Sequence, residues 1–272
     1  MKRLLVSLSV FLFLASFDFA EGAEARVTRV VKDVEVLVAP KPPRRAVLND
    51  AIQDGMALQT GVNSQTELQF TNGGLARLGS NTVFGIGRGT RRMGLAQGAM
   101  LIRAPAGAGE AQVKTASVST DVKGTTSILE YYPNGYIKLI VLEGTARMFM
   151  PGVLGESVLV NAGQLLMFHT KTMPTSLPSP VDVDLKRLTA TSLLIQGFPP
   201  LGSESSISKG VQSQTKQKSE GALADTNLVI FGRGTLVNLV PPSAEESARL
   251  STSKPSPSPT PLSRQSPART SR

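Results

Sequence analysis

Apolar and polar residues alternate through the middle of the chain, from about residue 46 to residue 170. Alternation with a period of two is typical of strands that have one buried and one exposed face. The clearest runs are 66–70, 100–103, 127–131, 136–141 and 164–168. Asn72-Gly73-Gly74, Pro133-Asn134-Gly135 and Pro151-Gly152 separate them as turns. The pattern predicts an all-β domain over 46–170.

The chain before this domain has the organisation of a secretory signal peptide. A basic start, Met1-Lys2-Arg3, leads into an apolar run over 4–17, and Ala23-Glu24-Ala25 supplies a small-x-small sequence. An uncleaved membrane anchor is the alternative, but this run gives a helix of about 21 Å against a hydrocarbon core of about 30 Å. We therefore expect residues 1–25 to be removed after Ala25, and a periplasmic or extracellular location in a bacterium.

The segments that flank the β domain differ from it in composition. Residues 26–45 predict one strand, with alternating Val34, Val36 and Val38, and then a basic proline-rich loop. Residues 171–200 predict a linker and one amphipathic helix over 181–196. We expect this helix to pack on the β domain, because Lys186 and Arg187 are too few basic residues for a membrane-surface helix.

The C-terminal third predicts little packed structure. Residues 201–246 are rich in Ser, Gln and Lys and predict a flexible segment, interrupted by a β-hairpin that pairs 227–231 with 235–240. Residues 226–240 could complete the β domain or dock on another protein as an edge strand. Residues 247–272 are rich in Ser and Pro, basic and without acidic residues, and predict a disordered tail.

Composition excludes several classes of site. The 272 residues include no Cys, no Trp and one His, so they cannot form disulfides, zinc fingers, iron–sulfur clusters or a thiol nucleophile. We expect no cofactor and no metal. The 29 Lys and Arg exceed the 20 Asp and Glu, which gives a net charge of +9. In an exported protein whose aromatic and basic residues are not interleaved, this charge favours acidic envelope polymers or anionic lipids over nucleic acid.

The candidates for catalysis are few. His169 ends a predicted strand without a nearby acidic residue, so we expect it to be solvated. Glu143 precedes Gly144, where its carboxylate is expected to accept backbone N–H bonds. An envelope hydrolase would need a cleft that joins carboxylates such as Asp121, Glu130 and Glu143, and no recognisable motif joins them. We expect the protein not to be an enzyme.

A glycine- and arginine-rich stretch lies at 85–92. Glycine N–H groups beside Arg88, Arg91 and Arg92 could hold an anion. The spacing fits neither the dinucleotide-binding motif nor the Walker A motif, and further strands follow it. The sequence favours a glycine-rich turn with solvated arginines.

The β region carries short motifs in a fixed order. They are Thr60-Gly61 with Ser64, Leu68-Gln69-Phe70, Asn72-Gly73-Gly74, 77–82, 97–100, 118–125, 141–144 and 161–164. In order and character this succession, from about Gly55 to His169, resembles the extracytoplasmic domain of the FecR family. The resemblance implies a small β-solenoid-like or two-layer β domain, followed here by one amphipathic helix, a short hairpin and a disordered tail.

The resemblance also implies that the motif residues are mainly turn and core positions. These structural residues are Thr60, Gly61, Gly74, Gly79, Gly98, Lys123, Gly124, Thr125, Glu143, Gly144, Gly163 and Gln164. Glycines recur at intervals of 13 to 26 residues, as expected if the chain turns at a glycine in each winding. The family usually has Arg where Lys123 stands, and lysine cannot make the bidentate hydrogen bonds of arginine.

In the type proteins of the family, this domain is the periplasmic half of a membrane-spanning sigma-factor regulator. In this chain we expect a signal peptide where the cytoplasmic domain should be, and no transmembrane segment for a relay. We therefore expect an exported, non-enzymatic module that binds a protein or envelope partner. An envelope polysaccharide or other anionic polymer, attracted by the basic tail and by Arg88, Arg91 and Arg92, is the alternative partner, and salt would release it.

Overall fold

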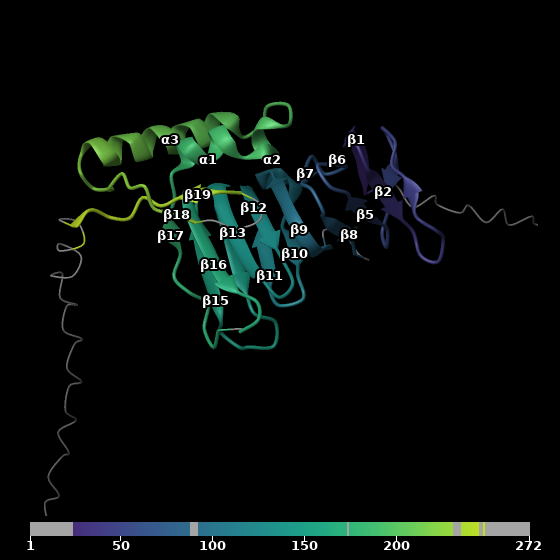
Figure 1. Ribbon diagram of the computed structural model, residues 1–272, viewed down its shortest axis with the longest axis horizontal. Coiled ribbons are helices and arrows are strands. Elements are labelled where there is room, and N and C mark those ends of the chain that lie inside the picture. The colour runs from purple at the N-terminus through teal and green to yellow at the C-terminus, as the bar shows by residue number, and fades with distance from the viewer. Residues whose placement is uncertain (1–23, 88–91, 173, 231–234, 245–246, 248–272) are drawn as a thin grey trace, which may run out of the picture.

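Two β-sheets packed face to face form the body of the protein, and helices lie along one side of it (Figure 1). The computed structural model describes residues 24–87, 92–172, 174–230, 235–244 and 247. The expected signal peptide, apart from Glu24 and Ala25, falls outside the described residues. So do Arg88, Arg91 and the expected tail beyond residue 247.

The strands divide into two sheets, which we call sheet A and sheet B. Sheet A has the order β4 (Ala51–Ile52), β1 (Ala25–Val31), β6 (Gln65–Phe70), β7 (Leu75–Leu78), β9 (Arg92–Ala104), β12 (Thr125–Tyr131), β13 (Tyr136–Glu143), β16 (Gln164–His169) and β17 (Val181–Asp182). Sheet B has the order β3 (Arg44–Arg45), β2 (Val34–Leu37), β5 (Ala57–Thr60), β8 (Val83–Ile86), β9, β10 (Ala111–Lys114), β11 (Ser119–Val122), β14 (Thr145–Phe149) and β15 (Ser157–Asn161). The prediction of an all-β domain is confirmed, and its two-layer form describes these sheets.

Strand β9 belongs to both sheets. Its first half pairs with β8 and β10 in sheet B, and its second half pairs with β7 and β12 in sheet A. The two halves meet at Gly98, whose φ is +99°. A Cβ atom there would stand 2.5 Å from the Cα of Thr82. Glycine is required because the backbone is left-handed and the neighbouring chain is too close for a side chain.

The central strands of sheet A are buried on both of their faces. The main core lies between the sheets and includes Leu58, Leu68, Met100, Leu129, Leu139 and Leu166. A second core lies on the outer face of sheet A, where Leu101, Ile128 and Ile140 pack against Leu185, Leu188, Leu194, Phe198 and Ile207. All seven residues of β12 are buried as a result. A strand that is covered on both faces loses the alternation of apolar and polar residues.

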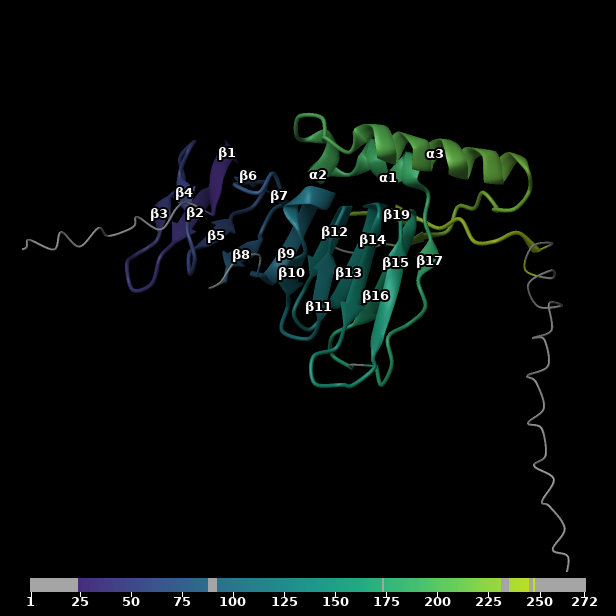
Figure 2. The ribbon, with the colours of Figure 1, turned by 180° about the vertical axis from the view of Figure 1, so that it is seen from behind.

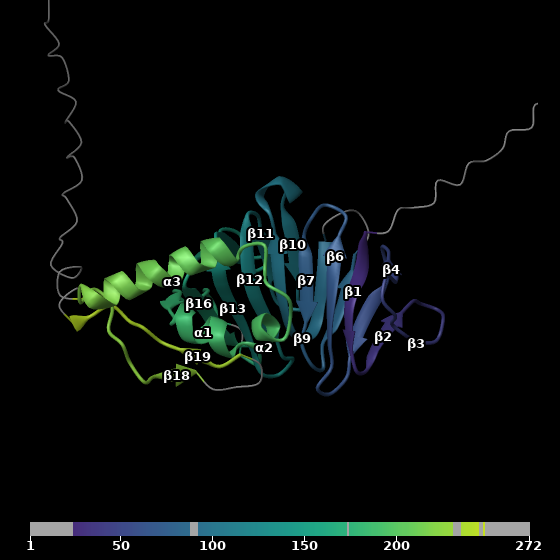
Figure 3. The same ribbon diagram turned by 90° about the horizontal axis from the view of Figure 1, so that it is seen from above.

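Helices α1 (Leu185–Thr191), α2 (Leu193–Gln196) and α3 (Glu204–Ser219) cover this outer face (Figure 3). The single helix expected over 181–196 is thus two short helices, because Ser192 has extended backbone angles (φ −69°, ψ 119°). The expectation of a flexible segment over 201–246 is wrong at residues 204–219, which form α3. Ile207 anchors this mostly polar helix in the second core, and partly buried Val211 packs beside it. Few apolar residues are enough when a preformed surface receives them.

The predicted hairpin forms as a short ladder between β18 (Val229–Ile230) and β19 (Val237–Asn238). Its turn, 231–234, lies outside the described residues. Val237 and Val240 are fully buried. The N–H of Asp184 donates to the Asn238 carbonyl at 2.8 Å, and the N–H of Val240 donates to the Asp182 carbonyl at 3.1 Å. In the structure, therefore, 235–240 completes the layer over sheet A.

Candidate functional site

The motif glycines mostly lie where the chain crosses between the sheets. Gly61 stands between β5 and β6, Gly79 between β7 and β8, Gly98 inside β9, Gly124 between β11 and β12, Gly144 between β13 and β14, and Gly163 between β15 and β16. Gly74 lies instead in the turn between β6 and β7. The motif thus contains the bends of the chain, and several of its glycines have the positive φ that favours glycine.

Threonine hydroxyls fasten the first of these bends. Thr60 Oγ1 donates to the Gly79 carbonyl and accepts from the Thr82 N–H at 2.9 Å. Thr82 Oγ1 in turn accepts from the N–H of Ala99 at 3.1 Å. These bonds join β5, the 79–82 bend and β9, so the position of the bend relative to β9 is fixed.

The later motif residues make similar local contacts. Thr125 Oγ1 donates to the Thr145 carbonyl at 2.8 Å. Lys123 is exposed. The carboxylate of Glu143 accepts from Thr126 Oγ1 at 2.9 Å, whereas backbone N–H donors were expected. Gln164 Oε1 accepts from the Asn161 N–H at 3.1 Å. None of these contacts brings groups together for a reaction.

Two buried ion pairs, which the sequence did not reveal as pairs, lie on the outer face of sheet A. In the first, Arg77 Nε stands 2.9 Å from Glu67 Oε2 across β6 and β7. Arg77 also donates to the carbonyls of Leu194, at 3.1 Å, and Pro199, and its guanidinium lies 4.8 Å from the ring centroid of Phe198. Burial lowers the pKa of Arg77, and the bond to Glu67 opposes this shift. This pair fixes α2 and the residues that follow it.

In the second pair, Lys138 Nζ stands 3.1 Å from Glu130 Oε2, and both side chains are fully buried. Thr235 lies over the pair. Its N–H donates to Glu130 Oε1 at 2.6 Å, and its carbonyl accepts from Lys138 Nζ at 2.8 Å. The residue proposed as a hydrolase carboxylate, Glu130, therefore holds the C-terminal segment in place.

The other candidates for catalysis are far from one another in the fold. Asp121 lies on β11 of sheet B and accepts from the Gln112 side chain, whereas Glu130 and Glu143 lie near opposite ends of their ladder in sheet A. His169 ends β16 and is exposed. Within the described part of the chain, no three acidic or histidine side chains gather as a metal site would require. The structure offers no cleft that joins the three carboxylates.

Asp184 joins two of the helices. Its carboxylate accepts from the Arg187 N–H at 2.9 Å and pairs with Lys218 Nζ at 2.8 Å. Burial acts to raise the pKa of Asp184, but the hydrogen bonds from Lys218 and Arg187 outweigh it and hold the pKa below its usual value. At neutral pH the charged Asp184 therefore stabilises the contact between α1 and α3. The nearby Asp182 differs: burial raises its pKa, and the hydrogen bond from Gln164 opposes this shift.

A groove of about 840 Å³ lies where the first bend meets the helical layer. Its walls are the bend at 79–81, Gln65, Gln97 and Ala99, Tyr132, the α1–α2 junction at 191–194, and Thr235 with Leu236. Leu193 is 70% exposed and Leu236 is 48% exposed. Leu193 precedes Leu194, whose carbonyl accepts from Arg77. Leu236 follows Thr235, which is bonded to Glu130 and Lys138. The groove therefore has two apolar side chains in fixed positions beside the amides of Asn81 and Gln97.

No pattern in the sequence predicted this groove. Leu193 and Leu236 follow the motif residues at 79–81 by more than 100 residues, and nothing in their local pattern distinguishes them from other surface leucines. The bonds from Arg77, Glu130 and Lys138 to the C-terminal segments, together with the packing of the second core, bring them to the bend.

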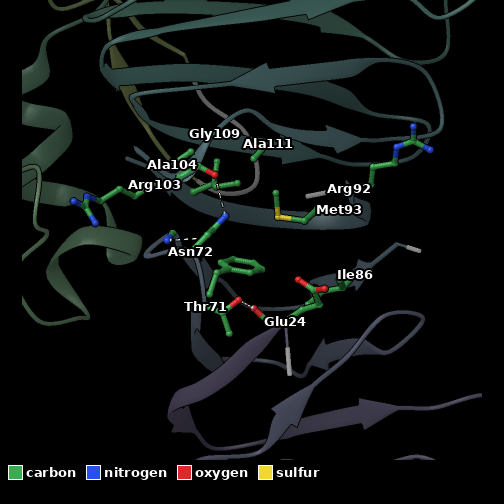
Figure 4. Close-up of a pocket in the computed structure, with 14 residues that line it drawn as sticks. Glu24, Thr71, Asn72, Ile86, Arg92, Met93, Arg103, Ala104, Gly109 and Ala111 are labelled. Atoms are coloured by element: carbon green, nitrogen blue, oxygen red, sulfur yellow. Dashed lines mark hydrogen bonds between the residues drawn. The ribbon is translucent and has the colours of Figure 1, made fainter. Parts of the chain in front are cut away.

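A second, smaller cavity of about 160 Å³ opens between the sheets (Figure 4). Phe70, Ile86 and Met93 give it an apolar wall. Arg92, one of the proposed anion ligands, lies at its rim, and its side chain points away from the cavity in Figure 4. The cavity is large enough for one apolar side chain and offers no cluster of cationic groups for an anion.

Comparison with known proteins gives one family. The profile of the family described as "FecR protein" matches residues 56–147. No curated protein matches the sequence. No helix in the described residues has both the length and the apolar character needed to cross a membrane.

Two solved structures are similar in part, and both are crystal structures of candidate anti-sigma factors from Parabacteroides distasonis ATCC 8503. The first, at 1.65 Å resolution, is 13% identical, with a TM-score of 0.38, and the match covers 43% of this chain and 57% of that chain. The second, at 2.50 Å resolution, is 8% identical, with a TM-score of 0.39, and the match covers 67% of this chain and 98% of that chain.

Proposed function

Because residues 56–147 form a FecR domain, we propose that this chain is a FecR-type regulatory protein that binds a protein partner and is not an enzyme. The groove between the first bend and the helical layer is the proposed partner site. One observation carries this assignment. Two buried ion pairs, Arg77–Glu67 and Lys138–Glu130, hold the neighbours of two exposed leucines at one groove beside motif residues.

The chemistry of the groove suits a peptide segment better than an anionic polymer. Leu193 and Leu236 offer apolar contacts, and the side chains of Ser80, Asn81 and Gln97 offer hydrogen bonds. Such a mixture is typical of the centre of a protein interface. Two of the basic residues near the first strands are in ion pairs: Arg44 stands 2.7 Å from Asp50, and Arg45 stands 3.8 Å from Asp33.

Changing Leu193 to Asp should lower recovery of the partner about tenfold or more, because a buried apolar contact at the centre of an interface is replaced by a charge. Leu193 is the first residue of α2, where an acidic side chain does not disturb a helix. The measurement is crosslinking of the full chain in cells, followed by recovery from the envelope fraction with washes at low and at high salt.

Leu48→Asp is the matched control, because Leu48 is 60% exposed and is not among the groove residues. A defined protein that survives high salt, is lost with Leu193→Asp and is kept with Leu48→Asp would support the proposal. Recovery of a polysaccharide that salt releases equally from all three proteins would contradict it and favour the anionic-polymer alternative.

We also propose that the protein is exported to the periplasm or beyond and that processing leaves Glu24 and Ala25 in the mature chain. Ala25 is fully buried and pairs with both Phe70 and Ile52, and the Glu24 carbonyl accepts from the Thr71 N–H at 3.1 Å. Cleavage after Ala25, as first expected, would remove the start of β1. Ala20-Glu21-Gly22 also has the small-x-small form.

The mature protein is therefore expected to begin at Ala23. Mass spectrometry of the N-terminal peptide from the exported protein measures this directly. A mature chain that begins at Arg26 would contradict the proposal that Glu24 and Ala25 are kept, and a chain that retains Met1 would contradict export by a cleaved signal.

A further inference from the structure

The four sheet ends differ in how they are protected against pairing with another chain. β4 and β3 have two residues each, and both residues of β3 are exposed arginines. Beyond β4, strand β1 carries a bulge between Val27 and Arg29. β17 also has two residues, and the next residue, Val183, bridges to Leu239. Short length, charge and bulges are the usual means of blocking an edge strand.

Within the described residues, β15 (Ser157–Asn161) has none of these three protections; a loop contacts only its approach, where the Leu177 N–H donates to the Glu156 carboxylate. It is five residues long, pairs in register with β14, and its sequence, Ser-Val-Leu-Val-Asn, has no charge, proline or bulge. It lies at the end of the body opposite β3 (Figure 2). Leu159, at its centre, is 48% exposed. An uncharged strand of this kind can accept another strand.

The direction of the backbone groups in β15 can be read from its ends. The Ser157 N–H donates to the Gly155 carbonyl at 3.1 Å, and the Asn161 N–H donates to Gln164 Oε1 at 3.1 Å. Both groups therefore point away from β14. Because backbone groups alternate along an antiparallel strand, the N–H and C=O of Leu159 point to the same edge, where no described residue bonds to them. The N–H groups of Ser157 and Asn161, at the two ends, are already bonded within the chain. The N–H and C=O of Leu159, at the centre, are the groups that another strand can bind.

We propose that two copies of this chain associate through β15, antiparallel and centred on Leu159, so that sheet B continues from one copy into the other. The occupant of the edge is a second copy because the strand is complementary to itself under two-fold rotation. Leu159 then faces Leu159, and each Leu159 N–H donates to the other Leu159 carbonyl. Val158 faces Val160, and Ser157 faces Asn161, so apolar meets apolar and polar meets polar.

The electrostatics of the strand agree with self-pairing. A charged residue on β15 would meet, or lie close to, its own copy across the two-fold axis, and like charges directly opposite are destabilising. The strand has no charge. Arg147 on β14 donates to Ser157 Oγ at 3.0 Å, so its guanidinium lies over one end of β15, and in the antiparallel pair the two Arg147 charges repel each other from opposite ends. Arg147 is exposed, so water and salt screen this repulsion.

Sedimentation velocity of the full chain over a concentration series tests the proposal. We expect a concentration-dependent dimer, because the interface is small. Leu159→Lys and Leu159→Glu should each be monomeric at concentrations where the wild-type protein is dimeric, since each places two like charges face to face. Mixing the two variants should restore a dimer, because position 159 of one copy faces position 159 of the other.

Val62→Lys is the matched control: Val62 is 71% exposed, lies at the bend between β5 and β6, and should dimerise like the wild-type protein. Circular dichroism of each variant shows that the fold is kept. A wild-type chain that stays monomeric up to about 1 mM, the weak end of specific affinities, would overturn the proposal. So would a dimer that survives both Leu159 variants, or two monomeric variants that do not associate when mixed.

Discussion

Changing Lys138 to Met should lower the free energy of unfolding by about 3 to 5 kcal/mol, because the Glu130 carboxylate would remain fully buried without its counter-charge. The carbonyl of Thr235 would lose its donor at the same time. Urea denaturation of the full chain near pH 7, followed by circular dichroism, measures this difference. The expected loss is a large part of the stability of a typical domain.

The double variant Glu130→Gln with Lys138→Met should recover part of the loss, because the amide oxygen can still accept from the Thr235 N–H and no charge remains buried. Lys216→Met is the control. Its partner is Glu220, both side chains are mostly exposed, and such pairs contribute at most about 1 kcal/mol. A Lys138→Met protein within about 1 kcal/mol of the wild type would show that the ion pair is not required for the fold.

Changing Gly98 to Ala should cost about 3 kcal/mol or more. The backbone at Gly98 has a φ of +99°, and the new Cβ would stand 2.3 Å from Thr82 Oγ1 and 2.5 Å from Thr82 Cα. The first contact could be relieved by a rotation of the side chain, but the second requires the backbone of the 79–82 bend to move. Strained backbone and overpacking therefore add together.

Gly94→Ala is a matched control on the same strand. Gly94 has no atom within 4 Å of its Cβ position and no positive φ, so alanine there should be neutral or slightly stabilising. Thermal unfolding of the two variants beside the wild type makes the comparison. Equal melting temperatures for the two variants would contradict the view that the bend in β9 depends on Gly98.

The periodicity of the sequence predicted the strands of the β body well. Runs such as 66–70 and 136–141 alternate or are β-rich, and they appear as β6 and β13. Alternation could not show that β12 is covered on both faces. Its seven residues are all buried, and a strand of this kind has no alternation of apolar and polar residues. The α3 helix was missed for a related reason. Only a few apolar residues, such as Ile207 and Val211, attach it to a surface that the sequence does not reveal.

The candidate site was less predictable than the fold. The motif gave the positions of the bends, such as Gly79 and Gly98, because left-handed or tightly packed backbone has a preferred residue type. The groove depends instead on contacts such as the bond between Arg77 and the Leu194 carbonyl, which joins residues 117 positions apart. Every residue has a backbone carbonyl, so a hydrogen bond to that group does not require a particular side chain at the accepting residue. Such a contact therefore cannot be recognised in a single sequence.

The two buried ion pairs have a consequence for the order in which the chain can fold. Glu130 cannot form its hydrogen bond until Thr235, which follows it by 105 residues, has been synthesised. Arg77 likewise needs the carbonyl of Pro199, which follows it by 122 residues. During synthesis from the N-terminus the strands of sheet A emerge before the helices, and their outer face then carries charges and apolar side chains with nothing to cover them. Contacts of such long sequence separation form late and make folding slow. Exposed apolar surface of this kind favours aggregation, so we expect the nascent β body to be more prone to aggregation than the complete chain.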